Sequence, residues 1–293
     1  MDKKLENIIA RIEELPTLPI ISQKILQLMT DEDVSYRDIV KLVENDQSLA
    51  LKIMKIANSA FFGSLNRISS LEQAMVKLGM NEVRSIVLAV SVYDFFSNSD
   101  SGAIDRERFW KHGIICSQTA KYLGSHYRIE DDDTLFLSGL VHDMGKAVLD
   151  EFFHDEFLNI INYLEMKRAT FSEAEKVVLG TTHYQIAAKL LSQWKFPKKI
   201  ILQVLYHHTP WADKTFETGS IMVYLANIIT KMAGYSCHKN EEEIDIEAFS
   251  KSSHVEYINK NGFELDNEIL ETLVNHIKEV IVEEADSVMQ FFG

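Results

Sequence analysis

Apolar residues recur every three to four positions through nearly the whole sequence, and segments in which apolar and polar residues alternate are scarcely seen. The first spacing places side chains on one face of an α-helix, whereas alternation is typical of a half-buried β-strand. The pattern therefore predicts an all-α protein. No internal repeat is evident, and the chain is expected to be globular throughout.

Capping residues divide the first hundred residues into short helices. The prolines in the stretch 15–19 should end the helix before them, because a residue that precedes proline disfavours the helical conformation. The stretch 97–105 is the least apolar of this half and has the composition of a loop. We therefore expect two lobes, residues 1–100 and residues 101–293. Helix starts are predicted at four caps, of which the first resembles a capping box: Ser35, Asp46, Ser70 and Asp105.

The second lobe is predicted to contain larger helices. Residues 131–149 open with acidic side chains, which are favoured near a helix N-terminus, and are expected to form one helix. The segment 172–175 reads as a capping box. Pro197 stands at a plausible first helical position, and Gly234 is expected to close a helix. A last helix is predicted over roughly 266–290.

Composition and charge narrow the classes of function. The chain has 293 residues, of which 46% are hydrophobic, so it can bury a substantial core. Its formal charge of −14 would repel phosphate backbones, which argues against nucleic acid as a partner. No apolar run is long enough to cross a bilayer and the start lacks a signal-peptide core, so we expect a cytoplasmic protein without a membrane partner.

The only two cysteines, Cys116 and Cys237, lie far apart in the sequence. Such a pair suits reduced thiols better than a disulfide framework. Cys116 is interpreted as a small core residue.

Two helices of the second lobe aim polar side chains at the core. His112 lies on an apolar stripe with Phe109 and Cys116. On the next helix His142 and Lys146 share a stripe with Leu135, Gly139 and Leu149. Asp143 sits one residue round, about 100° away, so that it and His142 could reach one ion. Lys146, one turn later, could meet a bound anion.

Three further histidines occur at helix ends. His183 follows two threonines, Thr181 and Thr182, at a predicted helix start, where free backbone N–H groups would also favour an anion. His207 and His208 end an apolar helix, so one of them must point inward, and His208 continues the apolar stripe. Other histidines lie in polar or terminal surroundings and are expected at the surface: His126, His154, His238 and His254.

The five inward histidines and Asp143 could hold one metal ion or two. Imidazole is a ligand for zinc, iron and other transition metals, and a carboxylate widens the choice to manganese and magnesium. Taken singly, each histidine is better explained as a hydrogen-bonded core residue, and Asp143 with Lys146 as an ordinary pair at helical spacing. Five such residues on four helices together favour a metal site.

These residues resemble a known family. The motifs RFWKHG at 108–113, GLVHDMGKAVL at 139–149, LGTTHYQIAAKLLSQWKFP at 179–197 and HH at 207–208 resemble the HD superfamily of metal-dependent phosphohydrolases. The first lobe is similar to the HDOD domain, the HD-related output domain of bacterial signalling proteins, in LPTLP at 15–19, VENDQSLALKIMKIANSAFFG at 43–63 and ISSLEQAMVKLGMNEVRSIVL at 68–88. The resemblance covers most of residues 10–235.

The resemblance implies a two-lobed helical HDOD fold with an HD-type second lobe. In the related HD-GYP phosphodiesterases, the equivalents of the five inward histidines and Asp143 bind metal, and the equivalent of Lys146 contacts the substrate phosphate. Two departures weigh against catalysis here. Asn227 stands where a final aspartate ligand is expected, and an amide ligates metal more weakly than a carboxylate. The segment after His208, TPWADKTFETG, lacks the Gly-Tyr-Pro signature.

Three hypotheses about function follow. The first is a non-catalytic bacterial signalling module that acts through protein partners and could retain a structural or sensory centre of iron, manganese or zinc. The second is a metal-dependent phosphohydrolase acting on a nucleotide or cyclic dinucleotide, with Lys146 as the phosphate contact. The third is DNA binding, because residues 71–90 contain two helices that meet at a glycine. Its second helix carries only Arg84 in a mostly apolar run, which suits a core helix better.

Overall fold

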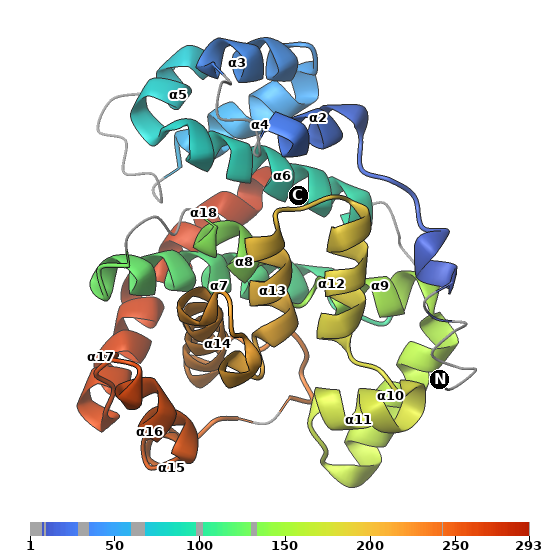
Figure 1. Ribbon diagram of the computed structural model, residues 1–293, viewed down its shortest axis with the longest axis vertical. Coiled ribbons are helices and arrows are strands. Elements are labelled where there is room, and N and C mark those ends of the chain that lie inside the picture. The colour runs from blue at the N-terminus through green and yellow to red at the C-terminus, as the bar shows by residue number, and fades with distance from the viewer. Residues whose placement is uncertain are drawn as a thin grey trace.

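The computed structural model describes residues 8, 10–28, 35–59, 68–97, 102–129, 134–241 and 243–292. Every regular element in these residues is a helix, which confirms the all-α prediction. The amino-terminal half contains α2 (Ile20–Leu28), α3 (Tyr36–Glu44), α4 (Gln47–Ala57), α5 (Leu71–Leu78) and α6 (Met80–Ser97). Figure 1 shows α2 to α5 gathered at one end of the molecule, on α6.

The remaining helices form the larger part of the molecule. They are α7 (Arg106–His126), α8 (Leu135–Val141), α9 (Met144–Phe152), α10 (His154–Lys167), α11 (Phe171–Leu179), α12 (His183–Gln193), α13 (Lys198–Tyr206), the short η2 (Pro210–Ala212), α14 (Glu217–Met232), α15 (Ile246–Ser250), α16 (Ser253–Lys260), α17 (Asn267–His276), the π-helical η3 (Ile277–Ile281) and α18 (Val282–Phe292). The predicted last helix over 266–290 is therefore α17 and α18 with one π-helical turn between them. None of the described helices is both long and apolar enough to span a bilayer.

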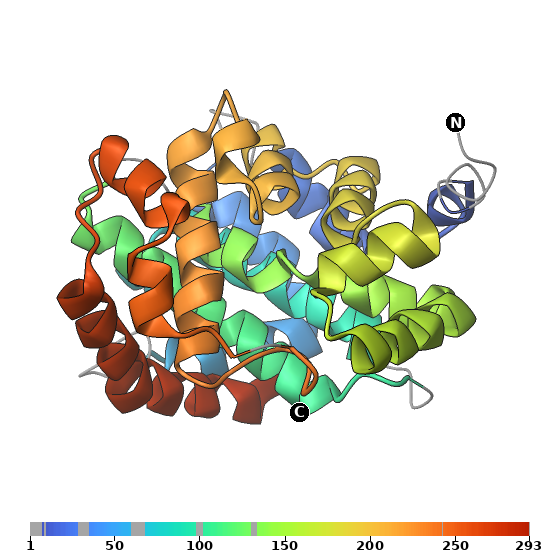
Figure 2. The same cartoon turned by 90° about the horizontal axis from the view of Figure 1, so that it is seen from below.

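The long helix α7 is the centre of the bundle and packs against α8, α14 and α18. Thirteen of its twenty-one residues are buried, so it is covered on nearly every side. Figure 2 shows α18 running along one side of the bundle, and it contacts α4 as well as α7. One continuous apolar core extends from Ile8 to Val288. The predicted lobe boundary at residues 100 and 101 lies outside the described residues and stays a prediction.

The four caps predicted up to Asp105 are present. The side chains of Asp46, Ser70 and Asp105 each accept a hydrogen bond from the backbone N–H three residues later. Ser35 forms a capping box with Asp38. Residues 16–19 are not helical, as the prolines predicted.

The prediction of one helix over 131–149 is wrong within the described part of that segment, and residues 131–133 lie outside it. The helix is interrupted at His142 and Asp143, between α8 and α9. At the interruption the N–H of Lys146 bonds to the carbonyl of Asp143, three residues back, at 2.8 Å. Because α8 packs on α7 and α13 while α9 packs on α12, two directions of packing divide the segment. The break places His142 and Asp143 at a helix junction.

The capping box predicted at 172–175 lies two residues earlier. Thr170 is the N-cap of α11 and pairs reciprocally with Glu173. Both registers fit the sequence rule, but Glu175 is fully buried and pairs with His183 instead. Pro197 is the N-cap of α13 rather than its first residue, and Gly234 follows α14 with a φ of +95°.

Candidate metal centre

Five histidines and one aspartate converge between α7, the α8–α9 junction, α12 and the end of α13. His112 lies on α7, His183 is the first residue of α12, and His207 and His208 follow α13. His112, His142, Asp143, His183 and His207 are each at most 3% exposed, whereas His208 is half-buried. The sequence favoured His208 as the inward member of the pair, yet His207 is the more buried one. Both rings nevertheless face the cluster.

The Asp143 carboxylate lies between two groups of imidazoles. Its Oδ1 is 3.1 Å from Nε2 of His183 and 3.7 Å from Nε2 of His207. Its Oδ2 is 3.5 Å from Nε2 of His142 and 3.7 Å from Nε2 of His112. Ligand atoms of Asp143, His183, His207 and His208 all lie within 4.8 Å of one another. These grouped ligand atoms could hold a metal ion.

The outer nitrogens of these rings are held by acceptors. Nδ1 of His112 bonds to the carbonyl of Tyr235 at 2.6 Å, and Nδ1 of His142 to the carbonyl of Gly139 at 2.7 Å. Nδ1 of His207 bonds to the carbonyl of Val204, also at 2.7 Å. A carbonyl only accepts, so each Nδ1 must donate, and each neutral ring then turns an Nε2 lone pair inward. Metal-binding histidines are typically oriented in this way.

His183 is oriented by a carboxylate rather than by a carbonyl. Glu175 on α11 accepts from Nδ1 of His183 at 2.8 Å and from its backbone N–H at 2.9 Å. The N–H predicted to attract an anion is therefore already bonded. The sequence singled out Glu175 only as the last residue of the capping box predicted at 172–175, and not as a partner of His183.

The inner atoms of the cluster fit a cation. Nε2 of His112 and Nε2 of His142 are 3.3 Å apart, and lone pairs at that distance repel unless a proton or a cation lies between them. Nε2 of His207 is one of the buried polar atoms without a hydrogen-bond partner among the described residues, and Oδ1 of Asn227 on α14 is another. A buried polar atom without a partner calls for an explanation, and an ion bound in the cluster would supply one for His207. The cluster can therefore hold a metal ion.

Burial and neighbouring charges tune these groups. Burial lowers the pKa of His112 and of His207 to about 3, so both rings are neutral ligands at physiological pH. Burial alone would raise the pKa of Asp143, but Lys146 and His142 hold it well below its usual range. Burial would lower the pKa of His183, but Glu175 raises it.

These shifts predict acid lability of the metal-free protein. In the unfolded chain a histidine has a pKa of about 6.5. Below that pH the histidines of the unfolded state become protonated, whereas His112 and His207 of the folded state remain neutral. The free energy of unfolding should then fall by roughly 1 kcal/mol per pH unit for each of the two residues. The raised pKa of His183 contributes stability that is fully present below the unfolded value of about 6.5 and is lost only at higher pH, so it does not offset this fall.

Urea denaturation in chelator between pH 7 and pH 5 measures this slope. His207→Gln should flatten it, and His126→Gln, at an exposed site, should leave it unchanged. A wild-type stability that does not fall with pH would contradict the assignment of neutral buried rings.

Lys146 is more buried than a lysine whose ammonium group is open to an anionic ligand. It is 1% exposed, and its Nζ donates to Asp143 Oδ2 at 2.8 Å, to Glu241 Oε1 at 2.8 Å and to Cys237 Sγ at 3.1 Å. Oε2 of Glu241 is 2.7 Å from Nζ of Lys231. Burial would lower the pKa of Lys146, but Asp143, Cys237 and Glu241 raise it well above its usual value. The sequence did not reveal Glu241, which stands in an acidic run typical of solvated surface.

Two other side chains have neighbours that the sequence did not reveal. Cys116 is buried as expected, but its Sγ is 3.6 Å from Nε2 of His112, and its ligand atom forms a second possible metal-binding group with His112 and His142. His238 was expected at the surface and is 8% exposed, because its ring packs edge-on against Phe171.

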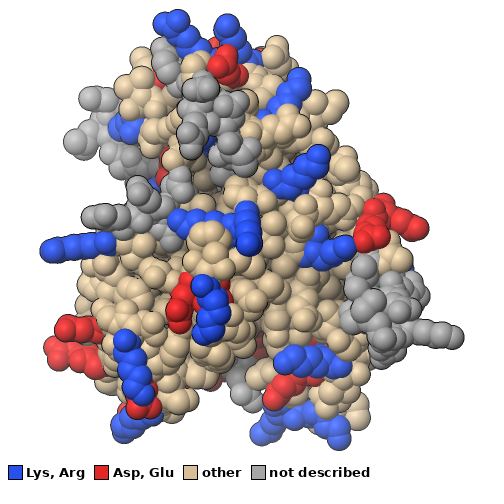
Figure 3. Space-filling model, viewed as in Figure 1, with Lys and Arg blue, Asp and Glu red and all other residues tan. Residues whose placement is uncertain are grey.

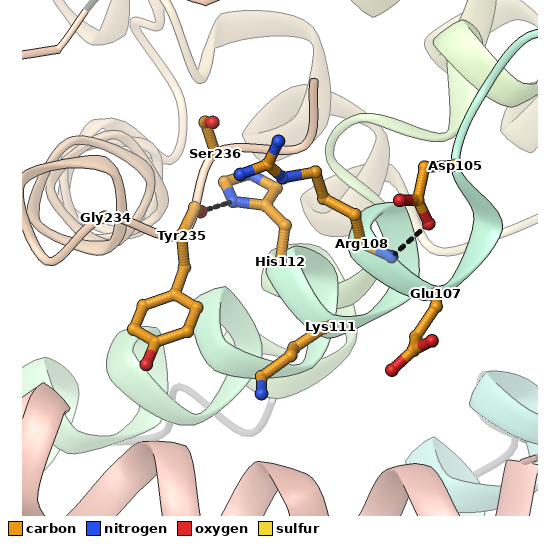
Figure 4. A pocket seen from close by; sticks show the side chains of 8 residues that line it. All are labelled: Asp105, Glu107, Arg108, Lys111, His112, Gly234, Tyr235 and Ser236. Atoms are coloured by element: carbon orange, nitrogen blue, oxygen red, sulfur yellow. Dashed lines mark hydrogen bonds between the residues drawn. The ribbon is translucent and has the colours of Figure 1, made fainter. Parts of the chain in front are cut away.

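Two cavities adjoin the cluster. One, of about 340 Å³, lies behind His112, where Arg108 and Lys111 on α7 face Tyr235 and the chain that follows α14. Figure 4 shows the ring of His112 bonded there through Nδ1 to the backbone of Tyr235. The other, of about 690 Å³, opens over Lys146, Glu241 and His208 and has apolar walls beyond them. Of the five inward histidines, His208 lines this larger cavity.

The chain is all-helical, and its buried imidazoles surround one aspartate at a helix junction. These two features define a class of helical proteins that have a histidine–aspartate site. The comparisons with known proteins identify it more closely. Residues 15–210, about two thirds of the chain, match the model of the HDOD domain. The chain belongs to the HDOD family.

Two similar proteins are a curated sequence relative and a solved structure. A protein of Treponema pallidum (strain Nichols) is 23% identical over 231 residues, which are 77% of this chain and 44% of that protein. The chain spans less than half the length of the curated relatives it matches. An HDOD domain protein from Geobacter sulfurreducens superposes with a TM-score of 0.80 at 23% identity, covering 98% of both chains.

Two further structures share the fold. A proposed phosphohydrolase from Shewanella amazonensis SB2B has a TM-score of 0.77 at 18% identity, with 98% of both chains covered. A proposed signal transduction protein from Marinobacter aquaeolei VT8 has a TM-score of 0.75 at 24% identity, covering 99% of this chain and 64% of that one. At these identities the likeness concerns the fold.

Proposed function

We propose that this HDOD chain is a regulatory module of bacterial signalling whose second lobe holds a transition metal and whose output is recognition of protein partners. The observation that carries the metal is the inward orientation of Nε2 on His112, His142 and His207, each fixed by a carbonyl on its other nitrogen. Family membership and the fold shared with a proposed signal transduction protein support the regulatory role.

The ion would be held by the inward nitrogens and by Asp143. A set of several imidazoles and one carboxylate suits iron, manganese and zinc, and the shared carboxylate allows one ion or two. Bound there, the metal would act as a structural or sensory centre that ties α7, α9, α12 and α13 together. Glu175 would stabilise the set by orienting His183.

Two observations favour regulation over catalysis. Asn227 is buried where the resemblance calls for a carboxylate ligand. Lys146 is engaged by Asp143, Cys237 and Glu241.

Nucleic acid is an unfavourable partner, because Arg84 is 5% exposed, and Figure 3 shows Lys and Arg side chains scattered over one face rather than gathered in a patch.

Elemental analysis of protein purified without chelator tests the metal. We expect one to two equivalents of iron, manganese or zinc in the wild type and a loss of most of it in His142→Ala. His126→Ala, which changes an exposed histidine outside the cluster, should retain wild-type content. Wild-type protein without transition metal, even after incubation with each ion, would refute the centre.

The second candidate is a metal-dependent phosphohydrolase. It is favoured by the large cavity that reaches Lys146 and His208, and by the fold shared with a proposed phosphohydrolase. Hydrolysis of nucleotides and of cyclic di-GMP with added manganese or iron distinguishes the two. We expect no turnover by the wild type, and turnover that His142→Ala abolishes would establish the hydrolase instead. If Asn227→Asp gains hydrolase activity, the amide at this position is the reason that the wild type has none.

A further inference from the structure

Glu241 is a buried carboxylate supplied by the chain between α14 and α15. Its side chain is 6% exposed. Oε1 accepts from Nζ of Lys146 at 2.8 Å and from Sγ of Cys237 at 2.9 Å, and Oε2 is 2.7 Å from Nζ of Lys231. The two oxygens therefore bridge two ammonium groups from α9 and α14. Burial would raise the pKa of Glu241, but Lys146 and Lys231 hold it well below its usual range.

The bridge lies at the floor of the larger cavity. Lys146, Lys231 and Glu241 all line this space of about 690 Å³, which is within the range of small-molecule sites. Its lining combines apolar residues, among them Leu164 and Phe249, with a larger number of polar ones, and Nζ of Lys146 lies 4.6 Å from the ring centre of Phe171. The cavity could accommodate an anion attached to an apolar or aromatic body.

The charges favour exchange of this carboxylate for a stronger anion. Lys146 and Lys231 contribute two positive charges, which Asp143 and Glu241 balance. A divalent ion held by Asp143 and the imidazoles would add two positive charges within the same buried region. Glu241 alone would then undercompensate the site, and a phosphate ester, with up to two negative charges, would compensate it better.

From these contacts we infer that Glu241 is an internal stand-in for a phosphoryl group. Lys146 and Lys231 form one anion site, and rotation of the Glu241 side chain toward the cavity opens it to a phosphate monoester with an apolar or aromatic body. This inference rests on the proposed metal centre for its full charge balance. A ligand must therefore displace the Glu241 carboxylate from the two lysines, and only a multiply charged ligand does so.

Calorimetric titration of Glu241→Gln with inorganic phosphate and with adenosine monophosphate tests the inference. Removing the competing carboxylate should tighten phosphate binding by about tenfold or more relative to the wild type, since close charge pairs in buried sites are worth several kcal/mol. The nucleotide should bind more tightly than inorganic phosphate, because its base can contact the cavity walls. Equal affinity of both probes would refute the apolar part of the site.

Glu243→Gln is the matched control, because Glu243 is exposed at the same cavity and loses the same charge. It should bind phosphate like the wild type. In Glu241→Gln the further change Lys231→Met should remove the gain. A gain of equal size in Glu243→Gln, or one that survives Lys231→Met, would overturn the anion site.

Stability supplies a second readout if Glu241→Gln folds poorly. Phosphate should raise its melting temperature more than that of the wild type, because the ligand replaces the lost counter-charge. Glu241→Asp keeps the charge on a shorter side chain and should fall between the two proteins; no effect of phosphate on either variant would overturn the inference. Metal analysis of the same samples separates the hypotheses. Metal without a phosphate gain refutes the stand-in alone, and a phosphate gain without metal refutes the metal centre alone.

Discussion

Replacing Gly145 by alanine should destabilise the protein by about 3 kcal/mol or more, which is large for a single added methyl group. Gly145 lies in the first turn of α9, where that helix crosses the start of α12. A Cβ built on it would overlap the carbonyl oxygen of His183 and lie 2.6 Å from the carbonyl carbon. Backbone cannot rotate away as a side chain can, so α9 and α12 must separate. Urea denaturation measures the loss.

Gly124→Ala is the matched control for this substitution. Gly124 is also a buried helical glycine, but its added Cβ would meet only Cδ1 of Leu135, the far end of a flexible side chain, at 2.5 Å. We expect a loss of less than about 1.5 kcal/mol there. If Gly145→Ala is no more destabilising than Gly124→Ala, the close approach of α9 and α12 is wrong.

Asp143→Asn is expected to have the largest effect on metal content, reducing it to background. The neutral amide is a weaker ligand, and it no longer carries the charge that faces both groups of imidazoles. It should also destabilise the metal-free protein by about 3 kcal/mol, because breaking a buried ion pair leaves Glu241 to compensate both Lys146 and Lys231. Elemental analysis and urea denaturation in chelator measure the two effects separately.

Asp94→Asn makes the same chemical change at the surface. Asp94 pairs with Lys52 while 43% exposed, and exposed pairs contribute less than about 1 kcal/mol. Metal content should not change in this control. Wild-type metal content in Asp143→Asn would exclude Asp143 as the shared ligand.

The helical periodicity and the caps up to Asp105 were predictable because they depend on nearby residues. Asp46, Ser70 and Asp105 bond to N–H groups three positions along the chain, so the sequence alone contains the interaction. The inward direction of His112 was predictable for the same reason, since it shares a stripe with Phe109. The division of 131–149 was not, because it depends on α12 packing against α9.

The sequence by itself determined the helical class, the caps and the residues that resemble an HD-type site, since each is encoded in local spacing or in motifs. Only the tertiary structure decided which groups meet. Glu175 reaches His183 across 8 positions, and Lys146 reaches Glu241 across 95. Such contacts arise because burial removes water from charged groups and leaves them to pair with one another. The periodicity of the sequence does not predict which of these groups pair.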